Sequence, residues 1–266
     1  MGGASEGVQW PRTVPEGGPD EATWRAVGAA IERAGAQALV VFDADGTLWD
    51  GDLGEVHLSS LGREGLVAAP AGYDTPFAAY MARCAVDASE GYAYAAELMA
   101  GLTESTVVAS AQRAWASHRG YLLSQVRAIF DAARAVAEVW IVSASNGYAI
   151  RAAAAELGLP PGRVIAMTNR VVGEELQPEI LQPRPNGAGK VRCIEAAIGR
   201  QPTVAVGNSL HDGAMLDAAE LGVLVRAVGQ GGETPEWSEA LRLRAERGAW
   251  LRLDCPIAPR APAIVG

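Results

Sequence analysis

Two aspartates, Asp43 and Asp45, follow an apolar run of the chain and lead into a glycine turn. The run at 38–42 predicts a buried strand, and side chains two residues apart on a strand point the same way. Carboxylates held side by side repel each other unless a cation or a shared proton lies between them. The stretch is therefore either a strand end with an ordinary acidic turn, or a site where both carboxylates do chemistry.

A second candidate is the segment Ser143-Ala144-Ser145, which follows the apolar residues 139–142. A hydroxyl group and unpaired backbone N–H groups at the start of a helix bind an anion, because the donors and the helix dipole act together. A serine in this position is also a common N-cap, so the segment alone leaves both interpretations open.

The third candidate is Lys190, in the segment Gly187-Ala188-Gly189-Lys190 that opens a predicted helix. A lysine there is usually solvated, and it lies at the unfavourable end of the helix dipole. Lys190 is nevertheless the only lysine in the chain, because the other 21 of the 22 basic residues are arginines. Either an arginine-rich composition left one lysine by chance, or the position requires a compact ammonium in place of a planar guanidinium.

The fourth candidate is the run Gly207-Asn208-Ser209-Leu210-His211-Asp212, at the end of another apolar stretch. Its amide oxygen and carboxylate are hard oxygen ligands of the kind that Mg²⁺ prefers. The alternative is a turn with an acidic helix start. His211 either contacts a substrate or has a solvent-facing or packing role.

The elements that position these candidates form a regular alternation. Short apolar runs are separated by helical patterns, which predicts an α/β fold with a parallel, Rossmann-like sheet and crossover helices. In such sheets ligands bind beyond the carboxyl ends of the strands, where Asp43, Ser143 and Asn208 fall. The predicted strands are residues 38–43, 139–143, 164–167, 203–207 and 223–228.

Residues 53 to about 135 interrupt the alternation, because they show helical faces and no strand pattern. One such face consists of Val107, Val108, Ala111 and Trp115. We expect an all-helical cap inserted after the first strand, where it could cover the two carboxylates. The predicted domains are an α/β core of residues 1–51 and 126–266, which begins with an irregular lead-in, and a cap of residues 52–125.

The composition of the 266-residue chain argues against several classes of protein. Hydrophobic residues make up 49%, enough for a large core, whereas a net charge of −9 without a long basic run argues against binding nucleic acid or anionic membranes. No apolar stretch approaches the ~18 residues of a membrane span, and the N-terminus lacks the regions of a signal peptide. Three scattered cysteines show no metal-ligand spacing, so a reduced, cytoplasmic protein is expected.

The order of the four segments resembles the haloacid dehalogenase (HAD) superfamily of phosphotransfer enzymes. Its first motif is D-x-D-x-[TV], and a serine or threonine, a lysine and an acidic loop follow in that order. The matching residues are Asp43, Asp45 and Thr47, then Ser143, then Lys190, and finally Asn208 and Asp212. The helical insertion resembles the cap of the phosphoserine phosphatase branch, which also contains phosphorylcholine phosphatases.

The resemblance implies an aspartyl-phosphate mechanism with Mg²⁺ as cofactor. Asp43 would attack phosphorus, and Asp45 would protonate the leaving alcohol and then activate water. Mg²⁺ would lie between Asp43, the Asp45 carbonyl and the fourth motif. The groups that would hold the phosphate oxygens belong to Ala44, Gly46, Thr47, Ser143, Ala144 and Lys190.

Asn208 departs from the family pattern, because phosphoserine phosphatases usually carry a metal-binding aspartate just after the glycine. A neutral amide binds Mg²⁺ less strongly, so Asp212 is a further candidate ligand, directly or through water. Asp45, in contrast, opposes a dehalogenase, because the second aspartate separates phosphatases from dehalogenases in this family.

We therefore expect a magnesium-dependent phosphomonoesterase acting on a small phosphorylated metabolite, without a nucleic-acid or membrane partner. One alternative is a phosphotransferase or phosphomutase of the same superfamily. The other is a catalytically weak phosphate-binding or regulatory protein, which Asn208 favours and the Asp43 and Asp45 pair opposes. The sequence does not predict an oligomeric state.

The acidic segment from Trp49 to Glu55 suggests a substrate that carries an amine. In the resembling branch an acidic residue at the corresponding offset reaches the substrate amine, and Asp52 lies nine residues after the predicted nucleophile. A carboxylate near a phosphate dianion is costly unless the far end of the substrate is cationic. Trp49, Tyr92 and Tyr94 are candidates for a cation–π contact with a quaternary ammonium. The alternative is that Asp52 belongs only to an exposed hinge into the cap.

Overall fold

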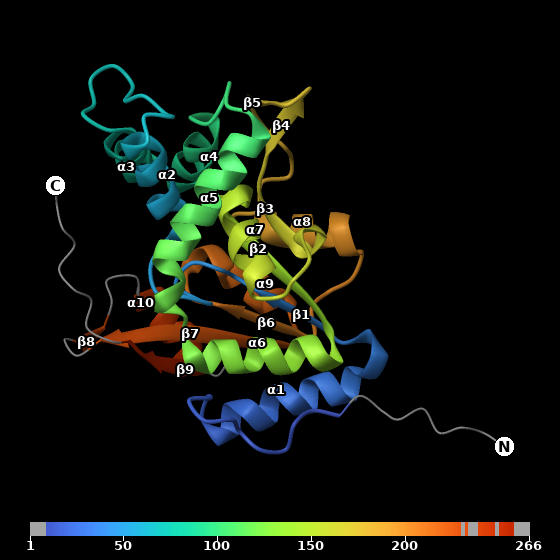
Figure 1. Ribbon diagram of the computed structural model, residues 1–266. Coiled ribbons are helices and arrows are strands. Elements are labelled where there is room, and N and C mark those ends of the chain that lie inside the picture. Colours follow the sequence, from blue (N-terminus) through green and yellow to red (C-terminus); the bar gives the residue numbers. More distant parts are fainter. Residues whose placement is uncertain (1–8, 230–231, 234–238, 248–249, 258–266) are drawn as a thin grey trace.

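The central feature of the molecule is a sheet whose parallel strands alternate with helices along the chain (Figure 1). The computed structural model describes residues 9–229, 232–233, 239–247 and 250–257. Within them the strand order is β3-β2-β1-β6-β7-β8, and β9 also pairs with β7. Only β8 is antiparallel to its neighbour among these strands. The strands are β1 (Leu39–Phe42), β2 (Glu138–Asn146), β3 (Val164–Met167), β6 (Val204–Gly207), β7 (Leu221–Gly229), β8 (Gly232–Glu233) and β9 (Leu251–Pro256).

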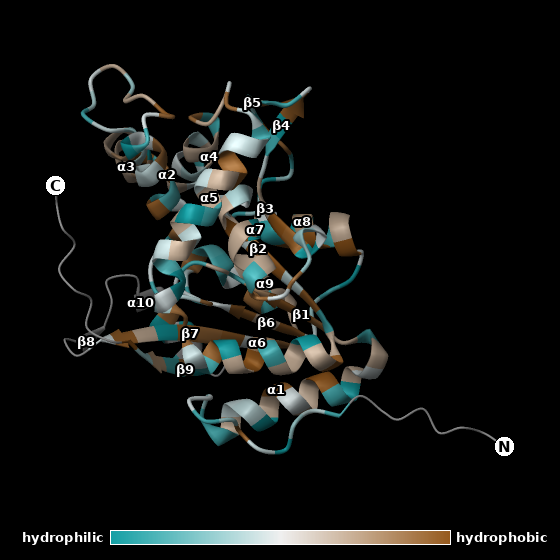
Figure 2. Cartoon of the chain, in the orientation of Figure 1, coloured by the Kyte–Doolittle hydropathy of each residue, from teal (hydrophilic) through white to brown (hydrophobic). Residues whose placement is uncertain are grey.

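β1 lies between β2 and β6 and is buried on both faces. Val40 and Phe42 contribute to the core on one face, and Leu39 and Val41 contribute to the core on the other. A strand covered by helices on both sides needs a continuous apolar run, which explains the composition of this segment. Figure 2 shows such apolar strands between helices of mixed hydropathy. The predicted α/β class is confirmed.

Helices pack on both faces of the sheet. One core contains Ile31, Phe130 and Ala153, from three different helices, and the other contains Ile194 and Leu216. The first face is covered by α1 (Glu21–Ala34), α6 (Ser124–Val136) and α7 (Gly147–Glu156). The second is covered by α8 (Ala188–Ile198), α9 (Gly213–Ala218) and α10 (Glu239–Glu246). Short 3₁₀ turns lie at Gly35–Gln37, Arg119–Tyr121, Pro161–Arg163 and Leu210–Asp212.

Four helices between β1 and α6 gather on one side of the sheet (Figure 1). Three of them share a small core that includes Leu61, Ala93 and Val107. Val108 was expected on the buried face of its helix but is 38% exposed, because it lies beside the i, i+4 row that starts at Val107. The helices are α2 (Leu53–Arg63), α3 (Pro76–Val86), α4 (Ala88–Glu97) and α5 (Glu104–His118).

A hairpin that the sequence pattern did not predict joins these helices to the core. It consists of β4 (Asn169–Val172) and β5 (Glu175–Ile180), which pair antiparallel. The main-chain N–H of Leu176 donates to Leu102 O at 2.9 Å, and Gly101 N donates to Leu176 O at 2.8 Å. The Asn169 side chain donates to Ala96 O at 2.9 Å. The helical insertion is therefore fastened to a second part of the chain, remote in sequence.

The two ends of the described chain are also more ordered than predicted. Trp10, in the expected lead-in, is 5% exposed and packs against Trp24, with ring centroids 4.6 Å apart. β9 extends the sheet beyond β7, in a region for which no strand was predicted. No helix in the described part of the chain is long and apolar enough to cross a membrane.

Candidate active site

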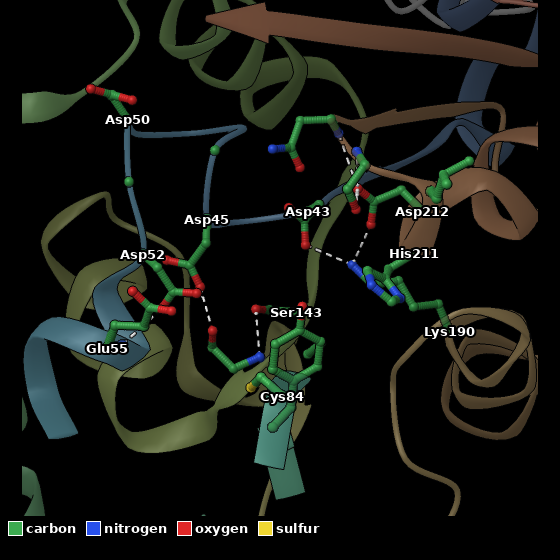
Figure 3. A pocket seen from close by; sticks show the side chains of 18 of the residues that line it. Asp43, Asp45, Asp50, Asp52, Glu55, Cys84, Ser143, Lys190, His211 and Asp212 are labelled. Carbon is green, nitrogen blue, oxygen red and sulfur yellow. Dashed lines mark hydrogen bonds and ion pairs between the residues drawn. The ribbon is translucent and has the colours of Figure 1, made fainter. Parts of the chain in front are cut away.

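The carboxyl ends of β1, β2 and β6 open into a pocket of about 700 Å³ (Figure 3). Because β1 pairs with β2 on one side and β6 on the other, Asp43, Ser143 and Asn208 meet there. Helices α2, α3 and α4 supply the facing wall. All site residues predicted from the sequence line this pocket except Ala44, Thr47, Trp49 and Tyr94.

The ammonium of Lys190 is the centre of a buried charge cluster. Nζ donates to Asp43 Oδ1 at 2.6 Å, to Asp212 Oδ1 at 2.6 Å and to Val142 O at 2.7 Å. Lys190 and Asp212 are each 1% exposed. α8 begins at Ala188, so the lysine projects from its first turn into the site and is not solvated. A compact group with three donors suits three acceptors around one point, which explains why an arginine-rich chain has lysine here.

The pKa values of the two aspartates in this cluster are shifted in opposite directions. Burial and the nearby charge of Asp212 raise the pKa of Asp43, although Lys190 acts against them. Burial also acts to raise the pKa of Asp212, but the Lys190 ammonium and the N–H groups of Ser209 and Asn208 hold it below its usual range. Asp212 therefore keeps its negative charge more firmly than Asp43.

Oxygen atoms suited to a small divalent cation converge beside Asp43. The Thr47 hydroxyl lies 3.1 Å from Asp43 Oδ2 and 3.3 Å from Asn208 Oδ1, so these two oxygens are neighbours. Gly46 has a φ of +70°, and a Cβ there would collide with the Asn208 amide, which is seated directly against the turn. A carboxylate, an amide oxygen and main-chain carbonyls are the donors that Mg²⁺ prefers, so the residues fit this ion.

Asp212 supports this loop through both of its carboxylate oxygens. Oδ1 accepts from Lys190, and Oδ2 accepts from the main-chain N–H groups of Asn208 and Ser209 at 3.0 Å each. No group of three or more His, Cys, Asp or Glu side chains among the described residues could hold a metal. An ion at this position would therefore depend on amide and main-chain oxygens in addition to carboxylates.

Asp45 is held by three donors on the other side of the turn. Oδ1 accepts from Trp49 Nε1 and from Leu53 N, each at 2.7 Å, and Oδ2 accepts from Ser145 Oγ. Burial raises the pKa of Asp45 despite these hydrogen bonds. Trp49, predicted as a substrate contact, is instead fully buried and does not line the pocket, and its indole N–H donates to Asp45.

The second motif lies within β2, whereas a helix start was expected. β2 extends to Asn146, whose Oδ1 accepts from Ala149 N at 3.0 Å and so caps α7. The strand continues this far because Asn146 pairs with β3 after a register shift. The Ser143 hydroxyl accepts from Ser145 N at 3.1 Å. An anion near Ser143 and Ala144 would therefore meet a strand end, not a helix N-terminus.

The wall of the pocket opposite Lys190 is acidic (Figure 3). Asp52 caps α2 by accepting from Glu55 N at 2.8 Å, and Tyr80 donates to Glu55 Oε1 at 3.2 Å. Burial raises the pKa of Asp52 well above its usual range, and the charges of Asp45 and Glu55 add to this effect. Asp52 is thus both a helix cap and a pocket residue, and not only an exposed hinge.

The aromatic residues predicted for the site are divided between the pocket and other environments. Tyr92 lines the pocket, and its ring meets His211 edge-on at 5.7 Å. Tyr94 lies under the guanidinium of Arg83 at 4.4 Å and is not among the described residues that line the pocket. Tyr80 was missed, because no pattern in the sequence of α3 links it to the first motif.

Comparisons with known proteins assign a family and a fold. The sequence model of the haloacid dehalogenase-like hydrolases matches residues 40–217. A search of the curated proteins finds no match. A functionally unknown protein from Anaerococcus prevotii is similar in structure, with 14% identity, a TM-score of 0.69 and coverage of 94% of this chain and 98% of that chain. A protein of unknown function from Bordetella pertussis has 19% identity, a TM-score of 0.67 and coverage of 82% of this chain and 99% of its own. A HAD family hydrolase from Salmonella enterica has 18% identity, a TM-score of 0.51 and coverage of 71% of this chain and 62% of its own. The family expected from the four motifs is confirmed.

Proposed function

The chain belongs to the haloacid dehalogenase-like hydrolases, and within this family we propose that it is a magnesium-dependent phosphomonoesterase that hydrolyses small phosphorylated metabolites. The observation that carries the proposal is that two carboxylates with different surroundings line one pocket. Asp43 lies against the Lys190 ammonium, whereas Asp45 faces the acidic wall and is held by neutral donors. Different surroundings suit a nucleophile and an acid–base group.

Asp43 acts as the nucleophile in this proposal. One of its oxygens forms a bond to phosphorus while the bond from phosphorus to the ester oxygen breaks. The ester oxygen keeps the electron pair, takes the proton of Asp45 and leaves as an alcohol. A water oxygen then bonds to phosphorus, Asp45 takes its proton, and the electron pair of the acyl-phosphate bond returns to Asp43.

Asp43, the main-chain carbonyl of Asp45 and Asn208 would hold the Mg²⁺ ion, with Asp212 supporting the loop or ligating through water. When bound, Mg²⁺ supplies positive charge that lessens the repulsion between a carboxylate and a phosphate dianion. Lys190 adds charge from the other side of Asp43. The phosphate oxygens would also meet the Ser143 hydroxyl and the backbone N–H groups of Ala44, Asp45 and Ala144. The N–H groups of Gly46 and Thr47, also predicted from the sequence, instead donate to Gly51 O at 3.0 Å and Ala44 O at 3.1 Å.

The acidic wall supports a substrate whose far end is cationic. Asp50, Asp52 and Glu55 line the pocket, and no arginine among the described residues does so. A neutral or anionic alcohol would bring no charge to offset these carboxylates, whereas an ammonium would. Tyr80 and Tyr92 add aromatic surface beside them. Amino alcohol phosphates fit this wall better than phosphoserine, because the described lining offers no arginine for the carboxylate of phosphoserine.

The test is phosphate release with Mg²⁺ from a panel of phosphocholine, phosphoethanolamine, phosphoserine, a sugar phosphate and a nucleotide. The proposal expects release from the amine-bearing esters with the highest kcat/KM, and none from Asp43→Asn. Transfer of the phosphoryl group to added glycerol or sugar in preference to water would instead indicate a phosphotransferase. Absence of release from every ester would leave phosphate binding as the function.

A further inference from the structure

We propose that Trp49 is a positioning residue for Asp45. The indole N–H of Trp49 and the main-chain N–H of Leu53 occupy one carboxyl oxygen of Asp45, so that only the other oxygen exchanges a proton with the substrate. This inference rests on the proposed function, because it assumes that Asp45 is the acid and base. It adds a buried tryptophan that does not line the pocket to the residues on which the reaction depends.

The hydrogen bonds of Asp45 distinguish its two oxygens. Oδ1 accepts from Trp49 Nε1 at 2.7 Å and from Leu53 N at 2.7 Å. A carboxylate oxygen has two lone pairs in its plane, so these two donors fill Oδ1. Neither an indole N–H nor a backbone N–H can accept a proton in return. A proton on Oδ1 would therefore break one of these bonds.

Oδ2 has a different partner, the hydroxyl of Ser145. A hydroxyl both donates and accepts, so it tolerates Asp45 with or without a proton. Ser145 itself lines the pocket, and a Cβ on Gly54 would lie 2.9 Å from its Oγ, so α2 begins in close contact with it. The oxygen that can gain and lose a proton is thus the one beside the pocket-lining hydroxyl.

Trp49 is fixed firmly enough to impose this orientation. Its side chain is fully buried, and its ring packs against Trp115 with centroids 5.2 Å apart. The main chain on either side is bound to the segment that leads into α6, through Leu123 N to Leu48 O at 3.0 Å and Asp50 N to Tyr121 O at 2.9 Å. An indole held from both sides gives Asp45 one rotamer before the substrate arrives, which is the condition for efficient proton transfer.

The test compares Trp49→Phe with Trp115→Phe in the full chain. Both changes remove one indole N–H from the same aromatic pair, but the Trp115 N–H donates to Glu156 Oε2 at 2.9 Å and not to Asp45. The readout is kcat/KM, which includes the step in which the alcohol leaves, for p-nitrophenyl phosphate and for the best alkyl ester. Nitrophenolate leaves without a proton, whereas an alkoxide requires one.

The proposal expects Trp49→Phe to lower kcat/KM for the alkyl ester about 10- to 100-fold more than for the aryl ester, the range of one hydrogen bond to a charged group. Trp115→Phe should change both substrates equally. Equal losses on the two substrates in Trp49→Phe would overturn the inference and leave Trp49 a packing residue.

Two further variants keep the result interpretable. If Trp49→Phe does not fold, benzothienylalanine at position 49 retains the ring shape without the N–H, and the same substrate split is expected. Asp45→Asn tests the proposed function separately. If it retains alkyl ester hydrolysis, the assignment of Asp45 fails. If it loses that activity while both Trp49 variants behave like Trp115→Phe, only the role of Trp49 fails.

Discussion

Lys190 Nζ lies 2.6 Å from Asp43 Oδ1, and the two side chains are 1% and 9% exposed. Asp212 Oδ1 lies at the same distance from Lys190 Nζ. The only lysine of the chain is thus placed between the proposed nucleophile and a carboxylate that supports the fourth-motif loop. We therefore expect substrate binding, loop geometry and stability all to depend on this one ammonium.

Replacement of Lys190 should therefore affect stability as well as turnover. Lys190→Met leaves Asp43 and Asp212 buried without a counter-charge, and breaking a buried ion pair typically costs about 3–5 kcal/mol. Lys190→Arg should not retain activity either, because a guanidinium cannot place one donor group within 2.7 Å of three acceptors around a single point. Urea unfolding at pH 7 measures the effect, with the exposed Arg192→Lys on the same helix as control. An unchanged urea midpoint in Lys190→Met would contradict this account of the cluster.

Asn208→Asp should strengthen Mg²⁺ binding. Asn208 Oδ1 lies beside the oxygen of Asp43 through their shared contact with Thr47, and a carboxylate binds Mg²⁺ more tightly than an amide does. The apparent Mg²⁺ affinity follows from the dependence of activity on free Mg²⁺ after EDTA treatment, and from the rise in Tm with added Mg²⁺. His211→Gln, on the same loop, is the control. Full activity in excess EDTA would show that no divalent ion is needed, and an unchanged affinity in Asn208→Asp would remove Asn208 from the ligands.

Asp52→Asn and Glu55→Gln should reduce the preference for cationic esters. Both residues lie on the acidic wall, and loss of one charge should lower kcat/KM for phosphocholine or phosphoethanolamine about 5- to 50-fold relative to p-nitrophenyl phosphate. Asp87→Asn, which changes an exposed carboxylate that caps α4, is the control. A uniform loss for all substrates would mean that Asp52 matters only as the cap of α2.

We also expect the preference for cationic substrates to depend on pH, because Asp52 on the acidic wall can gain or lose a proton. Burial, with the charges of Asp45 and Glu55, raises the pKa of Asp52, so this carboxyl loses its proton at higher pH than an exposed aspartate does. A cationic substrate favours the ionised form, which means that its binding releases a proton. The ratio of kcat/KM for phosphocholine to that for p-nitrophenyl phosphate should therefore increase with pH, and Asp52→Asn should flatten this dependence. A flat ratio in the wild type would place the charge of Asp52 outside substrate recognition.

A buried histidine should make the fold sensitive to acid. His57 in α2 is fully buried with Nδ1 3.3 Å from Asn146 Oδ1, and burial lowers its pKa to about 4 from 6.5. Between these values the unfolded chain binds more protons than the folded one, so stability falls as pH decreases from 6.5 toward 4. The loss amounts to at most about 3 kcal/mol. His57→Gln should have a flatter dependence of Tm on pH in this interval than wild type or His211→Gln, and an equal slope would refute the assignment.

The sequence predicted the parts of the fold that depend on local pattern. The apolar run at 38–42 and its four counterparts became β1, β2, β3, β6 and β7, because strands covered by helices need apolar runs. The hairpin β4–β5 was missed, although Gly173 with a φ of +64° follows a Val-Val pair and could have indicated a turn. β9 was missed as well, because its pairing with β7 is set by contacts remote in sequence.

The sequence likewise predicted some features of the site and not others. The order of the motifs and the unique lysine predicted that Asp43, Ser143, Lys190 and Asn208 would converge, and the pocket contains all four. Sequence spacing could not show that Trp49 turns into the core to bind Asp45, because either orientation of the indole satisfies the local pattern. Nor could it place Tyr80 against Glu55, since packing of α3 on α2 brings these residues together.

The central claim is that Asp43 forms a covalent phospho-enzyme. The most direct measurement is acid quenching of Asp45→Asn and wild type during turnover of p-nitrophenyl phosphate, whose leaving group needs no proton from Asp45, followed by mass spectrometry of the peptide that contains Asp43. The account predicts a hydroxylamine-sensitive phosphoryl group on Asp43, more abundant in Asp45→Asn because water activation is impaired, and absent in Asp43→Asn. A wild type that turns over without any phosphorylated peptide, or a phosphoryl group that persists in Asp43→Asn, would contradict it.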